Sequence, residues 1–307
     1  MLGLLLLDKP EGITSFGAVA KIKKLTGEKR VGHTGTLDPM ATGVLPILVG
    51  RATVLSQYLI EADKSYNATI KLGIATDSCD ITGNVISQSD VNCKDNDIEC
   101  VLRQFLGRQM QTPPMFSAIK QNGVRMYELA RRGETVDIPA REIEVFSLDK
   151  KSRLNEQNEF VIDCTVSKGT YIRSLCRDIG KVLGCGATLT TLRRTKTAGF
   201  DISRCVSLDD LTDENISEYI IPCDKVVDYL PKISVSEKQA IRFCNGGQLS
   251  LDRVRYDNFQ NDGLYRVYYE DKFLGLGQAD LGQNLLKIEC LVGQVYKNEN
   301  CNSAWYV

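Results

Sequence analysis

A single histidine occurs among the 307 residues, and the eleven cysteines include no Cys-x-x-Cys pair. Zinc sites are built from closely spaced cysteines and histidines, so this composition disfavours a metal centre and none is expected. The cysteines are scattered and odd in number, which predicts reduced, mostly buried thiols rather than a disulfide framework.

Long apolar runs are absent as well. The strongest, residues 2–7, is far shorter than the roughly 20 residues that a membrane-spanning helix needs. It lacks a basic segment before it and ends at Asp8-Lys9-Pro10, so we interpret it as a buried strand and not as a signal peptide. No membrane partner is expected, and the expected location is cytoplasmic.

Positive and negative charges nearly cancel, with 38 Lys and Arg against 39 Asp and Glu, but they are separated along the chain. One basic run covers residues 21–30, while acidic residues gather at 77–99 and 209–228. Such separation can present a cationic face to a polyanion, although ordinary solvated faces give the same pattern. The main basic run contains Lys168, Arg173, Arg177, Lys181, Arg193, Arg194 and Lys196.

The order of predicted elements is irregular. Apolar residues alternate at 66–74, as in a half-buried strand, and recur with helical spacing at 98–106. Helices are also expected near 16–25 and 171–183, each followed by a glycine. This pattern predicts an α+β fold rather than a doubly wound one. We expect a large domain at 1–204, a helical connector at 205–231 and a small β-rich domain at 232–307.

The most unusual segment is Gly-His-Thr-Gly-Thr-Leu-Asp-Pro at residues 32–39, which contains the only histidine, His33. Its glycines permit a sharp turn or a close approach to a ligand. Asp38-Pro39 also suits the start of a helix, because Asp is a good N-cap and Pro a good first helical residue. Spacing alone therefore leaves both a structural and a chemical interpretation open.

This segment, followed by Met-Ala-Thr-Gly-Val-Leu-Pro, resembles the signature of the bacterial tRNA pseudouridine-55 synthases, the TruB family. The resemblance covers about residues 4–200 and is dense. A weaker similarity to the PUA-like tail of these enzymes occurs at 264–277. The other matching stretches are Leu7–Pro10, Lys64–Tyr66, Pro114–Lys120, Ser167–Arg173 and Leu192–Arg194.

The resemblance implies a mixed, mainly antiparallel central sheet with flanking helices, followed by a small PUA-like RNA-binding domain. It also implies an isomerase that converts uridine-55 in the T loop of tRNA to pseudouridine after flipping the base out of the RNA. The reaction cuts the N1–C1′ bond and joins C5 to C1′. No cofactor is expected.

The matched positions assign the site. Asp38 corresponds to the family's catalytic aspartate, a carboxylate able to form a transient covalent bond. Arg173 corresponds to the arginine that pairs with it and favours its ionised form. Tyr66 corresponds to the tyrosine that stacks on the base and is placed to take the C5 proton, with Arg173 as the expected cation beside its phenol.

Three further positions are assigned to substrate binding by the same resemblance. His33 takes up space beside the flipped uridine, Tyr171 packs against the active aspartate or arginine, and the Leu192 backbone meets the uracil edge. Lys9 and Pro10 match the family but are expected only to support the site.

The implied partner is the T stem-loop of tRNA, recognised by loop shape, stacking and phosphate contacts, with no guide RNA and a monomeric enzyme. The basic runs at 21–30 and 168–196 are the candidate phosphate contacts. Residues 115–132 correspond to an RNA-clamping insertion in which Tyr127 either stacks on a base or packs in a helix. Three other functions stay open: RNA binding without catalysis, a guide-RNA-dependent relative, and a carboxylate glycosidase. The last would need a paired acid that the sequence does not reveal.

Overall fold

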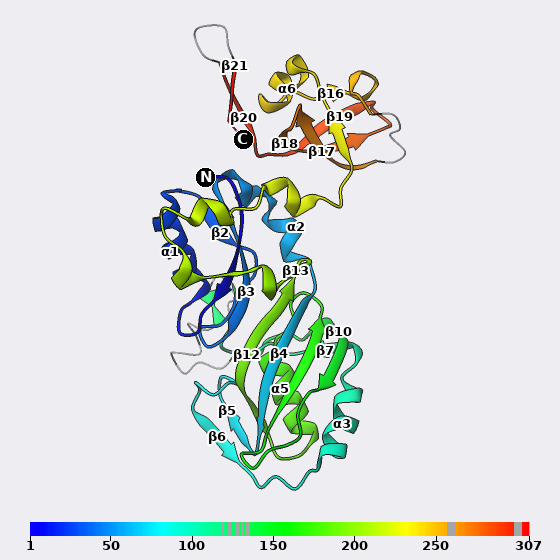
Figure 1. Ribbon diagram of the computed structural model, residues 1–307. Coiled ribbons are helices and arrows are strands. Elements are labelled where there is room, and N and C mark those ends of the chain that lie inside the picture. Colours follow the sequence, from blue (N-terminus) through cyan, green and yellow to red (C-terminus); the bar gives the residue numbers. More distant parts are fainter. Residues whose placement is uncertain are drawn as a thin grey trace.

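The structure, a computed structural model, describes residues 1–117, 120, 121, 124–126, 129, 132, 136–256, 262–297 and 303–306. Tyr127 lies outside the described residues. Figure 1 shows a large part built around a long twisted sheet and a smaller part that contains the C-terminal strands. None of the described helices is long and apolar enough to cross a membrane.

The large part is organised by one ten-stranded sheet of order β14-β1-β3-β12-β4-β11-β10-β7, with β2 beside β3 and β13 beside β12. The pairs β1–β14 and β3–β12 are parallel and the other neighbours are antiparallel. The predicted α+β class with a mixed, mainly antiparallel central sheet is confirmed. The strands are β1 (Gly3–Lys9), β2 (Val31–His33), β3 (Thr42–Val49), β4 (Lys64–Leu72), β7 (Gly107–Gln111), β10 (Arg141–Lys150), β11 (Glu159–Val166), β12 (Ala187–Thr197), β13 (Phe200–Asp201) and β14 (Val206–Ser207).

Helices α1, α3 and α5 contribute apolar side chains to the main core on one face of this sheet. Thr14 caps α1 by accepting a hydrogen bond from the Gly17 amide (2.9 Å), and Gly27 ends it in the left-handed conformation. The helices predicted near 16–25 and 171–183 are confirmed within a residue or two. The described helices are α1 (Ser15–Thr26), α2 (Ser56–Ile60), α3 (Asp95–Gln104), α5 (Ile172–Val182) and α6 (Glu237–Cys244).

Strand β1 confirms the buried strand predicted from its leucines. Leu5 and Leu7 join the main core, whereas Leu4 and Leu6 face the opposite side of the sheet. There they pack in a second cluster that includes Tyr268 and other apolar side chains of the C-terminal part. The two parts of the chain therefore share one apolar interface.

The C-terminal part is β-rich, as predicted. It holds a five-stranded sheet of order β15-β17-β18-β19-β16, a separate β20–β21 pair and helix α6. Residues 208–227, which precede it, carry three short 3-10 helices: η3 (Leu208–Asp210), η4 (Ile216–Tyr219) and η5 (Cys223–Val227). The strands are β15 (Lys232–Ser234), β16 (Leu249–Ser250), β17 (Gly263–Tyr269), β18 (Lys272–Asp280), β19 (Leu285–Leu291), β20 (Gln294–Lys297) and β21 (Ser303–Tyr306).

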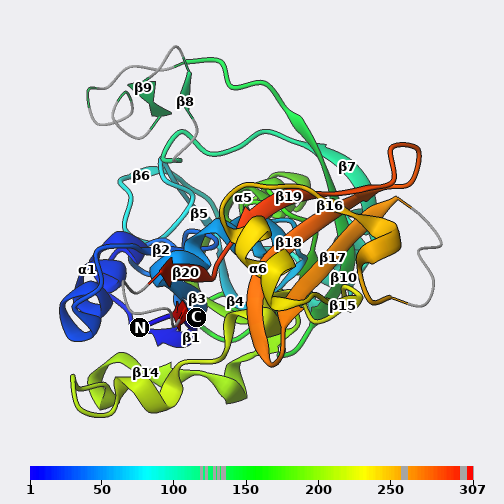
Figure 2. The ribbon, with the colours of Figure 1, turned by 90° about the horizontal axis from the view of Figure 1, so that it is seen from above.

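Two small antiparallel pairs complete the large part: β5 (Ile74–Thr76) with β6 (Val85–Gln88), and β8 (Lys120–Gln121) with β9 (Val124–Arg125). Figure 2 shows the β8–β9 pair standing away from the body of the large part. It belongs to the segment that resembles an RNA-clamping insertion.

Candidate active site

The loop between β2 and β3 carries Asp38 and is fixed on both sides of it. The Ser15 hydroxyl donates to the Leu37 carbonyl (3.0 Å) and accepts from the Leu37 amide (2.8 Å). The Pro39 carbonyl accepts from the Gly12 amide (2.9 Å). Asp38 begins no helix; its carbonyl accepts from the Ala41 amide in a turn. The helix-cap interpretation of Asp38-Pro39 is therefore wrong.

Lys9 of β1 also supports this loop through hydrogen bonds to backbone carbonyls. Its side chain is fully buried, and its ammonium donates to the carbonyls of Pro10 (2.8 Å), Ile13 (2.8 Å) and Pro39 (3.3 Å). Burial lowers the pKa of Lys9 to about 8 although Asp38 nearby acts in the opposite direction. The contacts agree with the expected supporting role.

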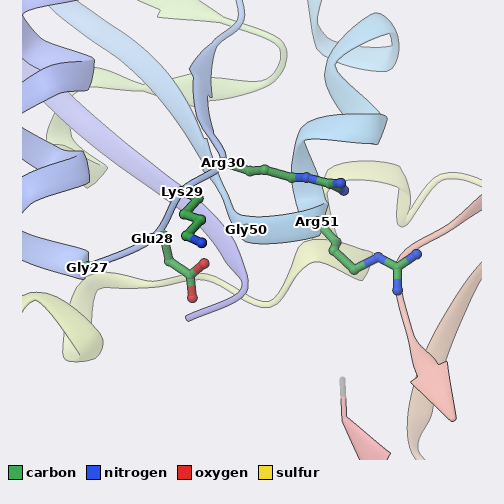
Figure 3. A pocket seen from close by; sticks show the side chains of 6 residues that line it. All are labelled: Gly27, Glu28, Lys29, Arg30, Gly50 and Arg51. Carbon is green, nitrogen blue, oxygen red and sulfur yellow. The ribbon is translucent and has the colours of Figure 1, made fainter. Parts of the chain in front are cut away.

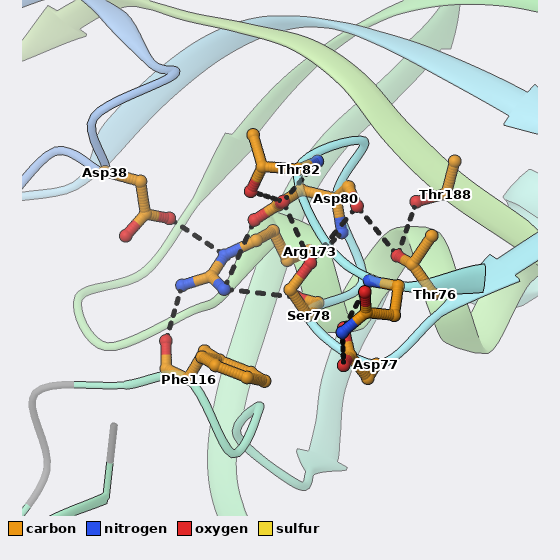
Figure 4. A network of polar contacts seen from close by, with 10 residues as sticks. Asp38, Thr76, Asp77, Ser78, Asp80, Thr82, Phe116, Arg173 and Thr188 are labelled. Atoms are coloured by element: carbon orange, nitrogen blue, oxygen red, sulfur yellow. Dashed lines mark hydrogen bonds and ion pairs between the residues drawn. The ribbon is translucent and has the colours of Figure 1, made fainter. Parts of the chain in front are cut away.

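Arg173, the second residue of α5, meets Asp38 in an ion pair whose Nε–Oδ2 distance is 2.8 Å. Its other nitrogens donate to the carbonyls of Ser78 (Nη1, 3.1 Å) and Phe116 (Nη2, 2.9 Å). Figure 4 shows the guanidinium reaching from α5 between these groups, with Asp38 on one side. Fixed by partners on several sides, Arg173 holds the carboxylate in one direction.

Sequence reasoning missed a second acid on the same guanidinium. Asp80 lies 3.4 Å from Arg173 (Oδ2 to Nη1) and is only 4% exposed. Its other oxygen accepts from Ser78 Oγ (2.9 Å) and from the amide and hydroxyl of Thr82 (3.0 and 2.5 Å). From the charge pattern alone, Asp80 is one member of the acidic stretch at 77–99. The sequence feature that could have distinguished it is the presence of Ser78 and Thr82 beside it, because these residues provide the donors.

The surroundings of Asp38 shift the pKa of its carboxyl group in opposite directions. Burial raises the pKa of its carboxyl group above the ordinary value, and Arg173 is the largest influence that opposes this shift. Asp80 adds to the increase. One third of the Asp38 side chain (33%) stays exposed, so the carboxylate is accessible to a ligand while Arg173 covers its other side.

Tyr66 lies on β4, opposite Cys164 of β11 and Arg194 of β12, and is 8% exposed. Burial raises the pKa of its phenol, whereas the charge of Arg194 and a hydrogen bond with it lower that pKa. The expectation that Arg173 supplies this field is wrong: α5 directs Arg173 toward Asp38, while Arg194 is the cation across from Tyr66.

These side chains line a hollow of about 570 Å³, a size typical of small-ligand sites. Five of the six predicted site residues line it: Asp38, Tyr66, Tyr171, Arg173 and Leu192. Lys64, Arg141 and Lys168 add positive charge around it. The hollow thus combines a reactive carboxylate with an aromatic wall and a cationic border.

Tyr171 is held through its backbone, which exchanges two hydrogen bonds with the Gln111 side chain (2.8 and 3.1 Å). Its ring is covered by the Arg141 guanidinium, 4.8 Å from the ring centre. Two buried nitrogens of Arg141, Nε and Nη2, have no hydrogen-bond partner among the described residues. Arg141 thus places a positive charge at the border of the hollow, with its Nε and Nη2 enclosed by protein.

His33 is the predicted residue that the structure does not bring into the wall of the hollow. It ends β2, half-buried, and its Nδ1 accepts from the Gly35 amide at 3.4 Å. Burial and the nearby charge of Arg194 lower the pKa of its imidazole. Its ring is consequently neutral at pH 7.

The main basic run does not form one cationic surface. Arg194 is 1% exposed, so the interpretation of this residue as a surface phosphate contact is wrong. Arg193 pairs with Asp8 (Nη2–Oδ2, 2.7 Å), and Lys168 pairs with Glu61. Lys181 and Lys196 are exposed.

The other basic run borders a second hollow of about 500 Å³, lined by residues 27–30 with Gly50 and Arg51 (Figure 3). Lys29, Arg30 and Arg51 supply its positive charge, and Glu28 pairs with the amino terminus. Two buried nitrogens of Arg51 have no hydrogen-bond partner within the part of the chain that the structure describes. This hollow lies at the opposite end of β3 from the Asp38 loop.

Comparison with protein families identifies the family of this chain. A model of the N-terminal domain of TruB family pseudouridylate synthases matches residues 23–172, and one of the C-terminal domain of tRNA pseudouridylate synthase B matches residues 173–228. The chain belongs to the TruB family. The family resemblance of the sequence motifs is thereby confirmed.

Curated relatives of this TruB-family chain match it over nearly its whole length. The tRNA pseudouridine synthase B of Clostridium novyi is 45% identical over 293 residues, which are 95% of this chain and 100% of the relative. That of Aromatoleum aromaticum is 41% identical over 296 residues, 95% of this chain and 93% of the relative.

Solved structures extend the similarity to ribonucleoprotein assemblies. A chain of a Cbf5-Nop10-Gar1 complex superposes with a TM-score of 0.69 at 28% identity, covering 94% of this TruB-family chain and 84% of the other. A chain of an H/ACA RNP bound to a substrate RNA containing 2′-deoxyuridine gives 0.68 at 26% identity, with the same coverage.

Proposed function

We propose that this chain isomerises uridine-55 in the T loop of tRNA to pseudouridine as a stand-alone enzyme, with Asp38 as its nucleophile. The observation that carries the proposal is the Asp38 carboxylate, held by Arg173 at 2.8 Å in a hollow that Tyr66 also lines. An ionised, oriented carboxylate beside an aromatic wall suits covalent chemistry on a flipped pyrimidine.

The reaction conserves every atom of the uridine. The N1–C1′ bond breaks, the base turns, C5 joins C1′, and the hydrogen on C5 leaves as a proton while N1 gains one. Attack of Asp38 on C1′, its attack on C6 and proton abstraction to a glycal all begin from the same carboxylate. Arg173 serves each route by favouring the ionised form against the effect of burial.

The remaining site residues receive roles by position and family match. Tyr66 stacks on the base and removes the C5 proton. Leu192, 7% exposed on β12, presents its backbone to the uracil edge, and Tyr171 forms part of the aromatic wall. His33 fills space in the T loop outside the hollow, as a neutral ring.

Phosphate contacts are assigned to the cations that line the two hollows. Arg141 borders the active site, and Lys29, Arg30 and Arg51 surround the second hollow. An RNA that reached both hollows would lie along β3. Arg193, which pairs with Asp8, and the buried Arg194 are not part of this proposed phosphate cradle.

The same proposal extends to the organisation of the chain. Residues 1–204 form the catalytic domain, 205–231 the connector and 232–307 a PUA-like RNA-binding domain. The enzyme acts as a monomer in the cytoplasm and needs no guide RNA. The β-rich C-terminal sheet and the extensive match to relatives named tRNA pseudouridine synthase B support this assignment.

A carboxylate glycosidase is the alternative for which Asp80 would be the paired acid, and the surroundings of Asp80 disfavour it. A glycosidase needs a second carboxyl group that reaches the substrate. Asp80 is 4% exposed, lies on Arg173 and accepts three hydrogen bonds through one oxygen. It is placed to orient Arg173 and not to protonate a leaving group.

The test uses a tRNA transcript and a second transcript with cytidine at position 55. The wild-type protein, without guide RNA or partner proteins, is expected to form pseudouridine at position 55 of the first transcript only. Asp38→Asn is expected to bind the tRNA without converting it. Absence of product from folded wild-type protein would contradict the proposed function, and turnover by Asp38→Asn would contradict the role of Asp38.

A further inference from the structure

Arg194 is the largest fully buried side chain in the part of the chain that the structure describes. It lies on β12, directly opposite Tyr66 of the antiparallel β4. Residues opposite each other on antiparallel strands project to the same face, so their side chains are neighbours. Arg194 also lines the active-site hollow, and the function proposed above gives it no task.

Backbone carbonyls fix the Arg194 guanidinium in place. Its Nε donates to the Val44 carbonyl (2.7 Å), and its Nη2 donates to the carbonyl of Gly35 in the Asp38 loop (3.2 Å). Gly35 also lies beside Nη1, since a β-carbon built on it would be in ordinary contact with that nitrogen at 3.5 Å. These contacts leave the side chain little freedom to turn away from Tyr66.

No acid among the described residues forms an ion pair with the Arg194 guanidinium. Arg173 and Arg193 both pair with carboxylates, but no ion pair of Arg194 within 4.0 Å occurs among the described residues. A buried cation without a counter-ion is costly, because neutral carbonyls replace only part of its hydration. A site that retains such a cation is well suited to stabilise negative charge that forms nearby.

Tyr66 is the group on which that charge can form. The groups that influence its phenol come from three directions: Arg194 on β12, Cys164 on β11 and Asp38 in the loop before β3. Burial, Cys164 and Asp38 raise the pKa of Tyr66, and Arg194 alone among these lowers it. Without Arg194, a buried phenol beside a carboxylate would hardly ionise.

We propose that Arg194 is a positioning residue that holds the Tyr66 phenol and stabilises its phenolate while the proton is removed from C5. The proposal rests on the proposed function, in which Tyr66 removes that proton. The phenol first loses its own proton to solvent. The phenolate then takes the proton from C5, the electrons of the C5–H bond return to the ring and restore its aromaticity, and Arg194 keeps its charge throughout.

The experiment uses the full-length protein and tRNA whose position-55 uridine carries either hydrogen or deuterium at C5. Three variants are compared with wild type: Arg194→Lys, which keeps the cation; Arg194→Met, which removes it; and Tyr66→Phe. Arg103→Met, at an exposed arginine of α3 outside the site, is the control. Single-turnover rates, tRNA affinity and thermal unfolding are measured for each protein.

Because acid–base groups contribute roughly 100-fold or more to rate, Arg194→Met is expected to slow product formation by about 100-fold and Arg194→Lys by about 10-fold. Affinity should stay within about 3-fold of wild type, since Arg194 is buried. In both variants the deuterium isotope effect should exceed that of wild type, because removal of the C5 proton has become the slow step. Arg103→Met should match wild type.

A slower folded Arg194→Lys with no increase in isotope effect would overturn the proposal, since Arg194 would then act on an earlier step through the Asp38 loop. An unchanged rate in both Arg194 variants would also overturn it. A different result would contradict the proposed function instead: Tyr66→Phe forming product at the wild-type rate would show that the phenol is not the base. The two failures are therefore distinguishable.

Discussion

At the scale of single residues, the site depends on which groups its two buried arginines contact. Arg173 contacts Asp38 and Asp80 together, whereas Arg194 contacts carbonyls and Tyr66. The motif Gly-His-Thr-Gly-Thr-Leu-Asp-Pro points to Asp38, and the other motifs point to Tyr66 and Arg173. Each of these three lines the hollow in the structure.

The parts of the site that sequence does not predict depend on burial, which neighbouring letters do not reveal. Arg194 lies in a run of basic residues, a pattern typical of exposed side chains, whether these face a polyanion or solvent. Its direction is set by the strand: Leu192 and Arg194 project to the covered face of β12 and Arg193 to the other. Asp80 escapes prediction for the same reason, since only the fold brings its turn to Arg173.

Asp38→Asn is expected to lower the single-turnover rate at least roughly 1,000-fold, because an amide is a very poor nucleophile. tRNA affinity is expected to stay near wild type. Since burial raises the pKa of Asp38 above its unfolded value, its ionisation makes the folded state less stable as pH rises through that pKa. Asn avoids this effect, so the variant should be at least as stable as wild type at pH 7.

The check combines filter binding, pseudouridine formation and urea unfolding. The stability difference between Asp38→Asn and wild type should shrink as pH falls through the raised pKa of Asp38, below which the wild-type carboxyl is also neutral. A variant that unfolds more easily than wild type at pH 7 would show that the ion pair with Arg173 outweighs the burial of Asp38.

His33→Ala is expected to weaken productive engagement of a folded T loop more than it slows the chemical step. Burial and Arg194 lower the pKa of His33 below its ordinary value, so the neutral ring predominates at pH 7 and above. Rates of wild type and variant should therefore show the same pH dependence between about 6.5 and 8. An ionisation in that interval that disappears in the variant would assign His33 to proton transfer.

At the scale of elements, the site is assembled where β3, β4 and β12 meet. Strand β12 pairs with β4 in antiparallel fashion and with the start of β3 in parallel fashion, so Arg194 is opposite both Tyr66 and Gly43. The sequence predicts these strands from their alternation and apolar content. It does not predict the pairing order, because contacts between residues 43, 66 and 194 form only when distant segments meet.

Gly43→Ala tests the close contact between β3 and β12. Gly43 has a φ of 103°, and an added β-carbon would lie 2.2 Å from the Arg194 carbonyl oxygen. Neither backbone can move without breaking the sheet, so we expect the free energy of unfolding to fall by about 3 kcal/mol or more. Gly27→Ala is the matched control: its φ is 66° but its surroundings are open, so a decrease of about 1 kcal/mol is expected. Equal decreases in the two variants would show that backbone strain alone matters.

At the scale of the whole molecule, a nearly neutral chain must still attract a polyanion. Its cationic side chains can attract RNA only where they do not already pair with carboxylates. Within the described part of the chain, the cations around the second hollow, at residues 29, 30 and 51, are of this kind. Composition gives no indication of this, since it counts Arg193 with its Asp8 partner and Arg194 in the core as equal to the free cations.

Replacing Lys29 and Arg30 together with Gln is expected to weaken tRNA binding and to reduce its dependence on salt. Removing one phosphate contact should lower the slope of log affinity against log salt by roughly 0.7 to 0.9. The chemical rate at saturating tRNA should not change, because these residues are remote from Asp38. Filter binding over a series of salt concentrations measures the slope, with Arg103→Gln as control; an unchanged slope would place the RNA elsewhere.

The apolar cluster shared by the two parts limits how the gene can be shortened. Leu4, Leu6 and Leu48 of the catalytic sheet pack in one cluster with Tyr268 and Phe273 of the C-terminal sheet. A chain truncated after residue 231 would expose these apolar side chains to solvent, and exposed apolar patches promote aggregation. We therefore expect the truncated protein to form large aggregates, detectable by light scattering, and not a minimal enzyme. A smaller catalyst would first require polar replacements for those leucines.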